Sequence, residues 1–196
     1  MILNTAGSEC IGGILDADAD VFFERRCSEK NSHSESLFSV IDAVLLDAKL
    51  TFQNISNLAV IVGPGSYTGL RAALSAAQGL EMASRVSVHA ITFLELHAYL
   101  ISRSFDENDV RNVVSVVETQ KEHIVYHQVF SSKLVPITSI SVESRDSIML
   151  KNEEQSVESV FSLSKNTKLI GEYLVYKLFH KLPETQLLPI YSRFYN

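Results

Sequence analysis

Residues 62–71 read Val62-Gly63-Pro64-Gly65-Ser66-Tyr67-Thr68-Gly69-Leu70-Arg71 and join an apolar run to an alanine-rich segment. The apolar residues of Leu58–Val62 predict a buried strand. Three glycines and a proline follow, and these residue types favour a tight turn or a close approach of two backbone segments. Ser66 or Thr68 can cap the helix that comes next. The segment therefore predicts a strand, a glycine turn and a helix in succession.

This junction is a candidate anion- or nucleotide-binding loop, because a helix N-terminus presents amide N–H groups and the positive end of a dipole. It lacks the Lys-Ser/Thr pair of a P-loop, and its glycine spacing differs from that of the dinucleotide fingerprint. The alternative is that the glycines only let the helix pack close to the sheet. Both interpretations stay open at this point. The candidate loop residues are Gly63, Gly65, Ser66, Thr68 and Gly69.

Composition restricts the class of protein. The chain has 196 residues, 46% hydrophobic content and a net charge of −6, which suits a globular protein and argues against a direct grip on a polyphosphate backbone. No apolar run approaches the ~20 residues of a membrane span, and no signal-peptide pattern occurs, so we expect no membrane contact and a cytoplasmic location. Cys10 and Cys27 fall on two strands predicted to be neighbours, and we expect free thiols there.

The order of elements predicts two related units. Residues 1–27 read as three short strands, and the apolar spacing becomes helical over His33–Ala48. A helix over about Thr68–Ser84, a strand at Val86–Ile91 and a helix opened by a Thr92 capping box complete the first unit. The later elements that we expect are strands at Asn112–Glu118, His123–Phe130, Lys133–Val142 and Lys168–Ile170, helices at Ser144–Lys151 and Glu172–Lys181, and an extended segment at Leu187–Tyr191.

The fold class that follows is α/β, with two domains of duplicated fold whose mixed sheets are flanked by helices. The polar segment 104–109 separates them, so we expect an N-terminal domain over residues 1–101 and an abbreviated C-terminal domain over residues 102–196.

Two of the predicted helices carry apolar side chains outside their main apolar stripe. Leu46 lies off the stripe of the first helix, and Leu74 and Met82 lie on the polar side of the second. Such residues indicate a partner surface, although scattered exposed apolar side chains are also normal.

The chemistry of a catalytic centre is missing from the sequence. His123 and His127 have an H-x-x-x-H spacing, but on a strand they would lie about 13 Å apart, too far to share one metal ion. Ser66 stands one place too early for a G-x-S-x-G nucleophile motif. We therefore expect no catalytic residue, no metal site and no cofactor, which favours a binding or scaffolding role.

The glycine motif supplies a family resemblance. Gly63–Arg71 matches G-P-G-S-[FY]-T-G-[LV]-R and resembles the TsaB/YeaZ family of bacterial tRNA threonylcarbamoyladenosine synthesis. The resemblance is specific over residues 1–101 and looser beyond. Further segments that resemble the family are Ala77–Leu80, His33–Leu37, Thr92–Leu94 and Leu188–Arg193.

The resemblance implies the actin/hexokinase-like ATPase (ribonuclease H-like) fold and a non-catalytic scaffold role. The chain would pair with a TsaD-like subunit that carries the metal ligands and the transfer chemistry. A TsaE-like ATPase would join the pair, and tRNA would be contacted only through the complex. The modified nucleoside would be the adenosine beside the anticodon of tRNAs that read ANN codons. The resemblance places the partner interface on the first two helices of the N-terminal domain, with His33, Leu37, Leu46, Arg71, Leu74, Gln78 and Met82 as the partner-binding residues.

Two departures from the family pattern bear on activity. Asn4-Thr5-Ala6 stands where family members carry Asp-Thr-Ala/Ser, and asparagine lacks the charge that holds a hard cation. Glu118-Thr119-Gln120 replaces a D-x-R segment. The alternatives to a scaffold are a glycoprotease-like or kinase-like ATPase of the same superfamily, and a homodimer that uses the same helices.

Overall fold

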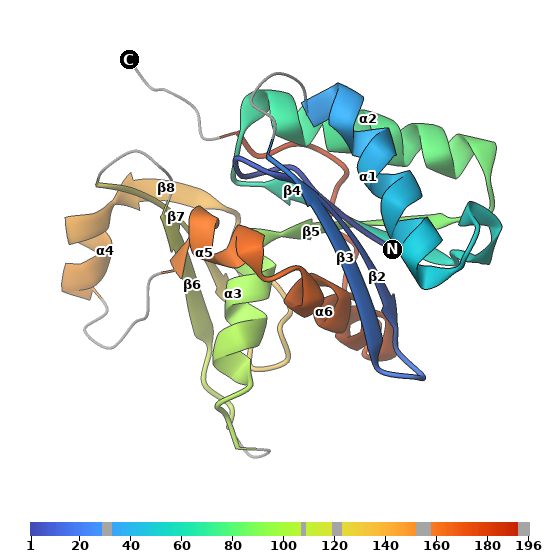
Figure 1. Ribbon diagram of the computed structural model, residues 1–196. Helices are drawn as coiled ribbons and strands as arrows, with labels where there is room; N and C mark the ends of the chain where they lie inside the picture. The colour runs from blue at the N-terminus through green and yellow to red at the C-terminus, as the bar shows by residue number, and fades with distance from the viewer. Residues whose placement is uncertain (29–32, 107–108, 119–122, 152–157, 192–196) are drawn as a thin grey trace.

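The computed structural model describes residues 1–28, 33–106, 109–118, 123–151 and 158–191, and it contains two mixed sheets flanked by helices (Figure 1). The first sheet has the strand order β3-β2-β1-β4-β5, and the second has the order β8-β7-β6-β9. This arrangement confirms the predicted fold class. The strands are β1 (Ile2–Asn4), β2 (Cys10–Asp16), β3 (Val21–Cys27), β4 (Asn57–Gly63), β5 (Ser87–Thr92), β6 (Val113–Glu118), β7 (Ile124–Phe130), β8 (Ser141–Ser144) and β9 (Glu158–Ser159).

The first sheet begins with three antiparallel strands, as the sequence predicts. β1 pairs antiparallel with β2 and parallel with β4. The β2–β3 hairpin closes where the Asp16 carboxylate accepts the backbone N–H groups of Asp18 and Ala19, both at 3.1 Å. Aspartate favours such turns because its short side chain can satisfy the amides that follow it. β4 and β5 then run parallel, joined by a helical crossover.

Helices cover both faces of the first sheet. One face packs against α1 (His33–Ala48) and α2 (Tyr67–Ala83), and the other packs against α3 (Phe93–Ser102) and α6 (Thr167–Phe179). The core beneath α3 and α6 continues into the second sheet, because Ile91, Val117 and Tyr173 belong to one buried cluster. The remaining helices are η1 (Phe52–Asn54), α4 (Arg145–Lys151) and α5 (Val160–Lys165).

Two predictions in the second half are wrong. Lys168–Ile170 does not form a strand but lies in α6, which begins where the Asn166 side chain accepts the N–H of Leu169. The strand predicted over Lys133–Val142 is shorter, since β8 starts only at Ser141 and Pro136 contributes one isolated bridge. Proline has no N–H group to continue a ladder. The 101/102 domain boundary stays a prediction.

No helix in the described ranges is long and apolar enough to cross a membrane.

Candidate functional site

The glycine loop is closely packed by other backbone segments. A Cβ atom on Gly69 would lie 1.9 Å from the carbonyl oxygen of Thr5, so the approach of the segment after β1 to α2 requires glycine at this position. Gly63 has a φ of +120°, and a Cβ atom there would lie 2.3 Å from the carbonyl oxygen of Ile190. These contacts support the packing interpretation of the motif.

Several polar groups of the loop are already used within the chain. The N–H of Ser66 donates to the carbonyl of Ala6 at 2.8 Å. The Ser66 side chain caps α2 by accepting the N–H of Gly69 at 3.3 Å, which selects Ser66 over Thr68 as the cap. The Thr5 hydroxyl donates to the carbonyl of Gly69 at 2.6 Å. Anion binding by Gly63, Gly65, Ser66, Thr68 and Gly69 stays a prediction.

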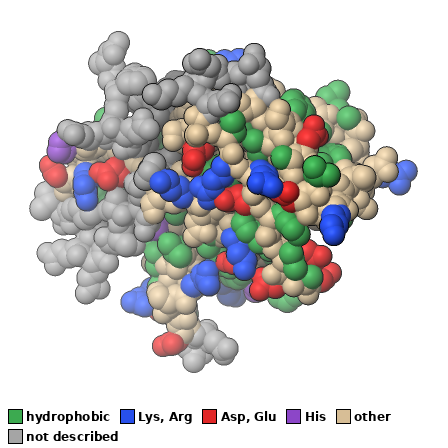
Figure 2. Space-filling model, viewed as in Figure 1, with side chains coloured by type: hydrophobic (Ala, Val, Ile, Leu, Met, Phe, Trp, Pro, Cys, Tyr) green, Lys and Arg blue, Asp and Glu red, His purple; other side chains and the backbone are tan. Residues whose placement is uncertain are grey.

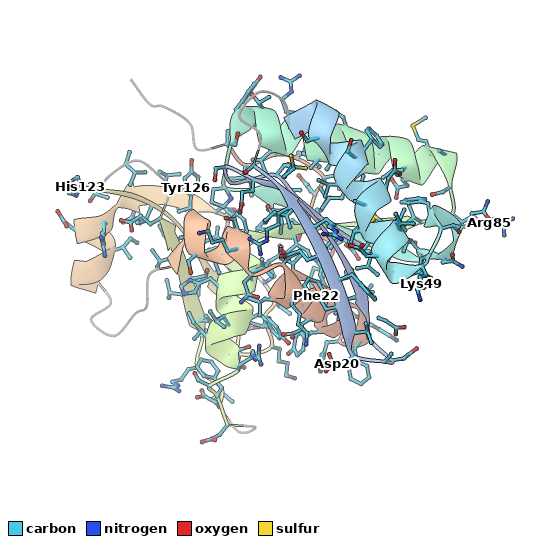
Figure 3. The ribbon with its side chains drawn as sticks, in the orientation of Figure 1. Asp20, Phe22, Lys49, Arg85, His123 and Tyr126 are labelled. Atoms are coloured by element: carbon cyan, nitrogen blue, oxygen red, sulfur yellow. The ribbon has the colours of Figure 1, made fainter. Side chains whose placement is uncertain are left out.

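Aromatic side chains lie over the start of α2. The rings of Tyr67 and Tyr191 have centroids 4.5 Å apart, and the Arg71 guanidinium lies 5.2 Å from the centroid of Tyr67. The Tyr126 hydroxyl donates to the Tyr191 carbonyl at 2.7 Å. A residue of the second sheet therefore holds the backbone of Tyr191 in place. Figure 3 labels Tyr126 beside the upper end of the first sheet.

The side chain of Asn4, where the resemblance leads us to expect aspartate, forms two hydrogen bonds within the chain. Its side-chain N–H group donates to the carbonyl of Ser164 at 2.9 Å, and its oxygen accepts the N–H of Ala6 at 3.1 Å. With only 1% of its surface exposed, the side chain links β1 to α5. Among the described residues, no three His, Cys, Asp or Glu side chains gather as a metal site.

The two histidines of the H-x-x-x-H spacing lie in different surroundings. His123 stands before β7 with a φ of +71° and lies at the left end of the second sheet in Figure 3. His127 lies on β7 with its Nε2 atom 3.3 Å from the Glu143 carboxylate.

The outer surface of α1 and α2 exposes large apolar side chains. Met82 is 90% exposed and Leu46 is 78% exposed. Phe38 and Tyr67 are also exposed, by 52% and 55%. We call these four residues the helical face. In the upper right part of Figure 2, hydrophobic atoms lie among uncharged and acidic ones.

The structure distributes the predicted partner-binding residues unevenly. Leu46, Arg71, Gln78 and Met82 are exposed on α1 and α2. Leu37 and Leu74, by contrast, are only 1% and 6% exposed and lie in the core between the helices and the sheet. This burial corrects the expectation that they offer contact surface.

The side chain of His33 lies outside the part of the chain that the structure describes, as do Ser192 and Arg193 of the C-terminal resemblance and Thr119 and Gln120 of the replaced segment.

Sequence reasoning missed Phe38 and Tyr67. Phe38 could have been found, because it follows Leu37 of the apolar stripe just as Leu46 follows Leu45, and neighbours in a helix point about 100° apart. Tyr67 was considered only as part of the glycine motif and not as a surface residue. Phe38 lines an open groove of about 440 Å³ between α1 and α2, together with Leu37, Thr68, Arg71, Ala72, Ser75 and Ala76.

The helical face is fixed to the sheet by polar contacts at its rim. The Arg25 guanidinium on β3 donates two hydrogen bonds to the Asp47 carboxylate on α1 and holds the pKa of that carboxyl below its ordinary value. Lys49 and Arg85, at the far ends of α1 and α2, project outward in Figure 3. The exposed surface of α1 and α2 therefore mixes the apolar side chains of the helical face with polar and charged ones such as Asp42, Arg71 and Gln78. Protein–protein contacts also combine apolar and polar surface.

Two mixed sheets flanked by helices and a strand–glycine-loop–helix junction define a mixed α/β protein. The structure is similar to that of YeaZ from Pseudomonas aeruginosa, with a TM-score of 0.67 and 17% identity over 97% of each chain. A second solved structure, described as an uncharacterized protein with similarity to peptidase YEAZ from Pseudomonas aeruginosa, has a TM-score of 0.66 and 16% identity over 98% of each chain. At this identity the likeness shows a shared fold.

Sequence comparison places the chain in a family. The family model described as "TsaD: tRNA N6-adenosine threonylcarbamoyltransferase" matches residues 27–170, and the chain belongs to this family. Its similar relatives carry the name tRNA threonylcarbamoyladenosine biosynthesis protein TsaB. One from Buchnera aphidicola is 22% identical over 87% of this chain and 73% of the relative. Another from Haemophilus influenzae is 28% identical over 54% of this chain and 43% of the relative. The matches thus span from under half to about three quarters of the relatives' length.

Proposed function

We propose that the chain is a non-catalytic scaffold subunit of the complex that makes threonylcarbamoyladenosine in tRNA. It pairs with a TsaD-like subunit through the helical face, and a TsaE-like ATPase joins that pair. The name that the relatives share supports the pathway, and the family model supports a TsaD-like partner of related fold.

The observation that carries the proposal is the exposure of Met82 and Leu46 on two neighbouring helices, at 90% and 78%. Apolar surface of this kind gains free energy when a partner removes it from water, at about 25 cal/mol per Å². The helices themselves are held from behind by Leu37 and Leu74, so the face is presented on a rigid support.

The state of Asn4 supports a non-catalytic role. Both polar atoms of its amide are occupied by protein partners at 2.9 and 3.1 Å. A carboxylate that held a cation at this position would instead need oxygen atoms free for the metal.

Co-purification tests the proposal. Wild-type chain and a tagged TsaD-like protein from the same host are expected to elute as one complex. Met82→Glu and Leu46→Glu are expected to weaken the complex at least tenfold, because each places a charge in the apolar contact. The matched control is Val110→Glu, since Val110 is 84% exposed outside the helical face.

Two results would contradict the scaffold role. Equal binding by all three variants would show that the helical face is not the contact. ATP or peptide turnover by the pure chain alone would favour the enzyme alternative. In the absence of a partner we expect the same face to pair two copies of the chain, and light scattering at several concentrations measures this.

A further inference from the structure

The two cysteines lie directly opposite each other in the first sheet. The β2–β3 ladder pairs Cys10 with Cys27, and Ile11 pairs with Arg26 next to them. Residues that face each other in an antiparallel pair direct their side chains to the same side of the sheet. Both thiols are free in the structure.

The backbone spacing fits a disulfide. Opposite residues of an antiparallel pair have Cα atoms about 4.5–5.5 Å apart. Disulfides span Cα separations of about 4.4–6.8 Å. The strands therefore need not separate or slip for Cys10 and Cys27 to be joined.

The two thiols differ in their access to solvent. Cys10 is 1% exposed and belongs to the core cluster that contains Leu37 and Val40 of α1. Cys27 ends β3 and is partly exposed. Burial, with a smaller contribution from Cys27, raises the pKa of the Cys10 thiol to about 11. Cys27 is thus the thiol that a dissolved oxidant can reach, and Cys10 is protected until a neighbouring sulfur reacts.

We propose that Cys10 and Cys27 are a reversible modification site, in which a low-molecular-weight disulfide converts the two thiols into a cross-strand disulfide. The Cys27 thiolate attacks one sulfur of the oxidant, which breaks the oxidant's S–S bond, forms a mixed disulfide and releases one thiol. Cys10 then loses its proton and attacks the Cys27 sulfur, which forms the cross-strand bond and releases the second thiol. Two protein thiols are oxidised and one small disulfide is reduced to two thiols.

The bond would fix the edge of the first sheet. In the described ranges β3 pairs with β2 alone, and Arg25 on β3 binds Asp47 on α1. A covalent link between β3 and β2 keeps this edge in place beneath α1, and closing the loop restricts the unfolded chain. The inference does not depend on the proposed function.

The experiment uses the full chain incubated with glutathione disulfide under native conditions. Thiols are counted in denaturant and the intact mass is measured. The wild type is expected to lose both thiols together, to lose two hydrogen masses as a monomer, and to recover both thiols with dithiothreitol. The second step is expected to accelerate as the pH rises toward 11, because the pKa of Cys10 lies there.

Two variants separate the roles of the thiols. Cys10→Ser is expected to stop with one glutathione on Cys27, and Cys27→Ser is expected to gain none. The oxidised wild type should melt at a higher temperature than the reduced form, and neither variant should show this change. The proposal fails if the native wild type keeps both thiols, ends with glutathione on Cys27, or forms its disulfide between two chains. The wild-type masses decide these outcomes even if a variant does not fold.

Discussion

The two faces of the first sheet are covered in different ways. The layer of α3 and α6, which we call the closed face, buries even the charges of Glu95 and Lys177, which are 5% and 1% exposed, although Phe179 at the end of α6 is 80% exposed. The layer of α1 and α2 has a comparable apolar interior but leaves Met82 and Leu46 in solvent. Both layers leave large apolar side chains in solvent, but among the described residues only the layer of α3 and α6 encloses a buried pair of opposite charges.

The closed face depends on a buried polar network. The Lys177 ammonium lies 3.0 Å from the Glu95 carboxylate, which also accepts the hydroxyls of Thr185 and Tyr173 at 2.8 and 3.2 Å. The other oxygen of Glu95 accepts the N–H of Thr92 and completes the predicted capping box. The network joins α3, α6 and the segment after α6. Lys177 and Glu95 depend on each other because a charge left alone in the interior is costly.

The largest expected effect is therefore at Lys177. Replacing it in Lys177→Met removes the cation and leaves the Glu95 carboxylate buried without it, which is expected to cost about 3–5 kcal/mol of unfolding free energy. Urea denaturation measures this. Lys168→Met on the same helix is the control, because Lys168 forms exposed ion pairs with Asp20 and Glu172 that are worth only about 0–1 kcal/mol. Equal losses in the two variants would show that the network does not hold the closed face.

A second test compares the inner and outer sides of α2. Leu74→Ala is expected to destabilise the fold by about 2–4 kcal/mol, because Leu74 is 6% exposed and its removal leaves a cavity. Met82→Ala is expected to change stability by less than about 0.5 kcal/mol, since its side chain contacts mainly solvent. Urea denaturation of both variants decides the point. A large loss in Met82→Ala would show that the residue serves the fold rather than a partner.

The first half of the chain could be predicted because its signals are local. The β2–β3 turn, the strand Leu58–Val62 and the helix after the glycine motif follow from residue types that satisfy their own neighbours. The Thr92 capping box is a local signal of the same kind. The division of α2 into an inner and an outer side was less accessible, because helical periodicity placed Leu74 on the polar side and the tertiary contacts with α1 and the sheet bury it.

The second half could not be predicted as well because its signals are not local. The strand predicted over Lys168–Ile170 and the helix predicted from Glu172 form one helix, α6, and Gly171 lies inside it, where a Cβ atom would be 2.9 Å from the Leu15 side chain. Gly171 allows α6 to pack closely on β2, a strand that lies more than 150 residues earlier in the sequence. The network of Glu95 and Lys177 was missed for the same reason, because its partners are 82 residues apart.

The smallest expected effect concerns alkaline pH and again separates the two faces. The pKa of Cys10, beneath α1, is raised to about 11 from an ordinary value of 9.0. The unfolded chain releases this proton from about pH 9 upward and the folded chain retains it, so the stabilisation is complete below pH 9 and lost between pH 9 and 11. Burial and the nearby Glu95 carboxylate raise the pKa of Tyr173, on the other face, above its ordinary value of 10.0. Its stabilisation is therefore complete below pH 10 and lost above it.

Unfolding free energies measured from pH 8 to 11 in reducing buffer test both signs. Relative to the wild type, Cys10→Ala is expected to flatten the decline that begins near pH 9, and Tyr173→Phe is expected to flatten only the part above pH 10. The reducing agent keeps Cys10 and Cys27 from forming a disulfide, so the measurement reports proton release alone. If Cys10→Ala leaves the slope between pH 9 and 10 unchanged, the thiol is not buried from solvent by α1, and the interior of that face is more open than that of its counterpart.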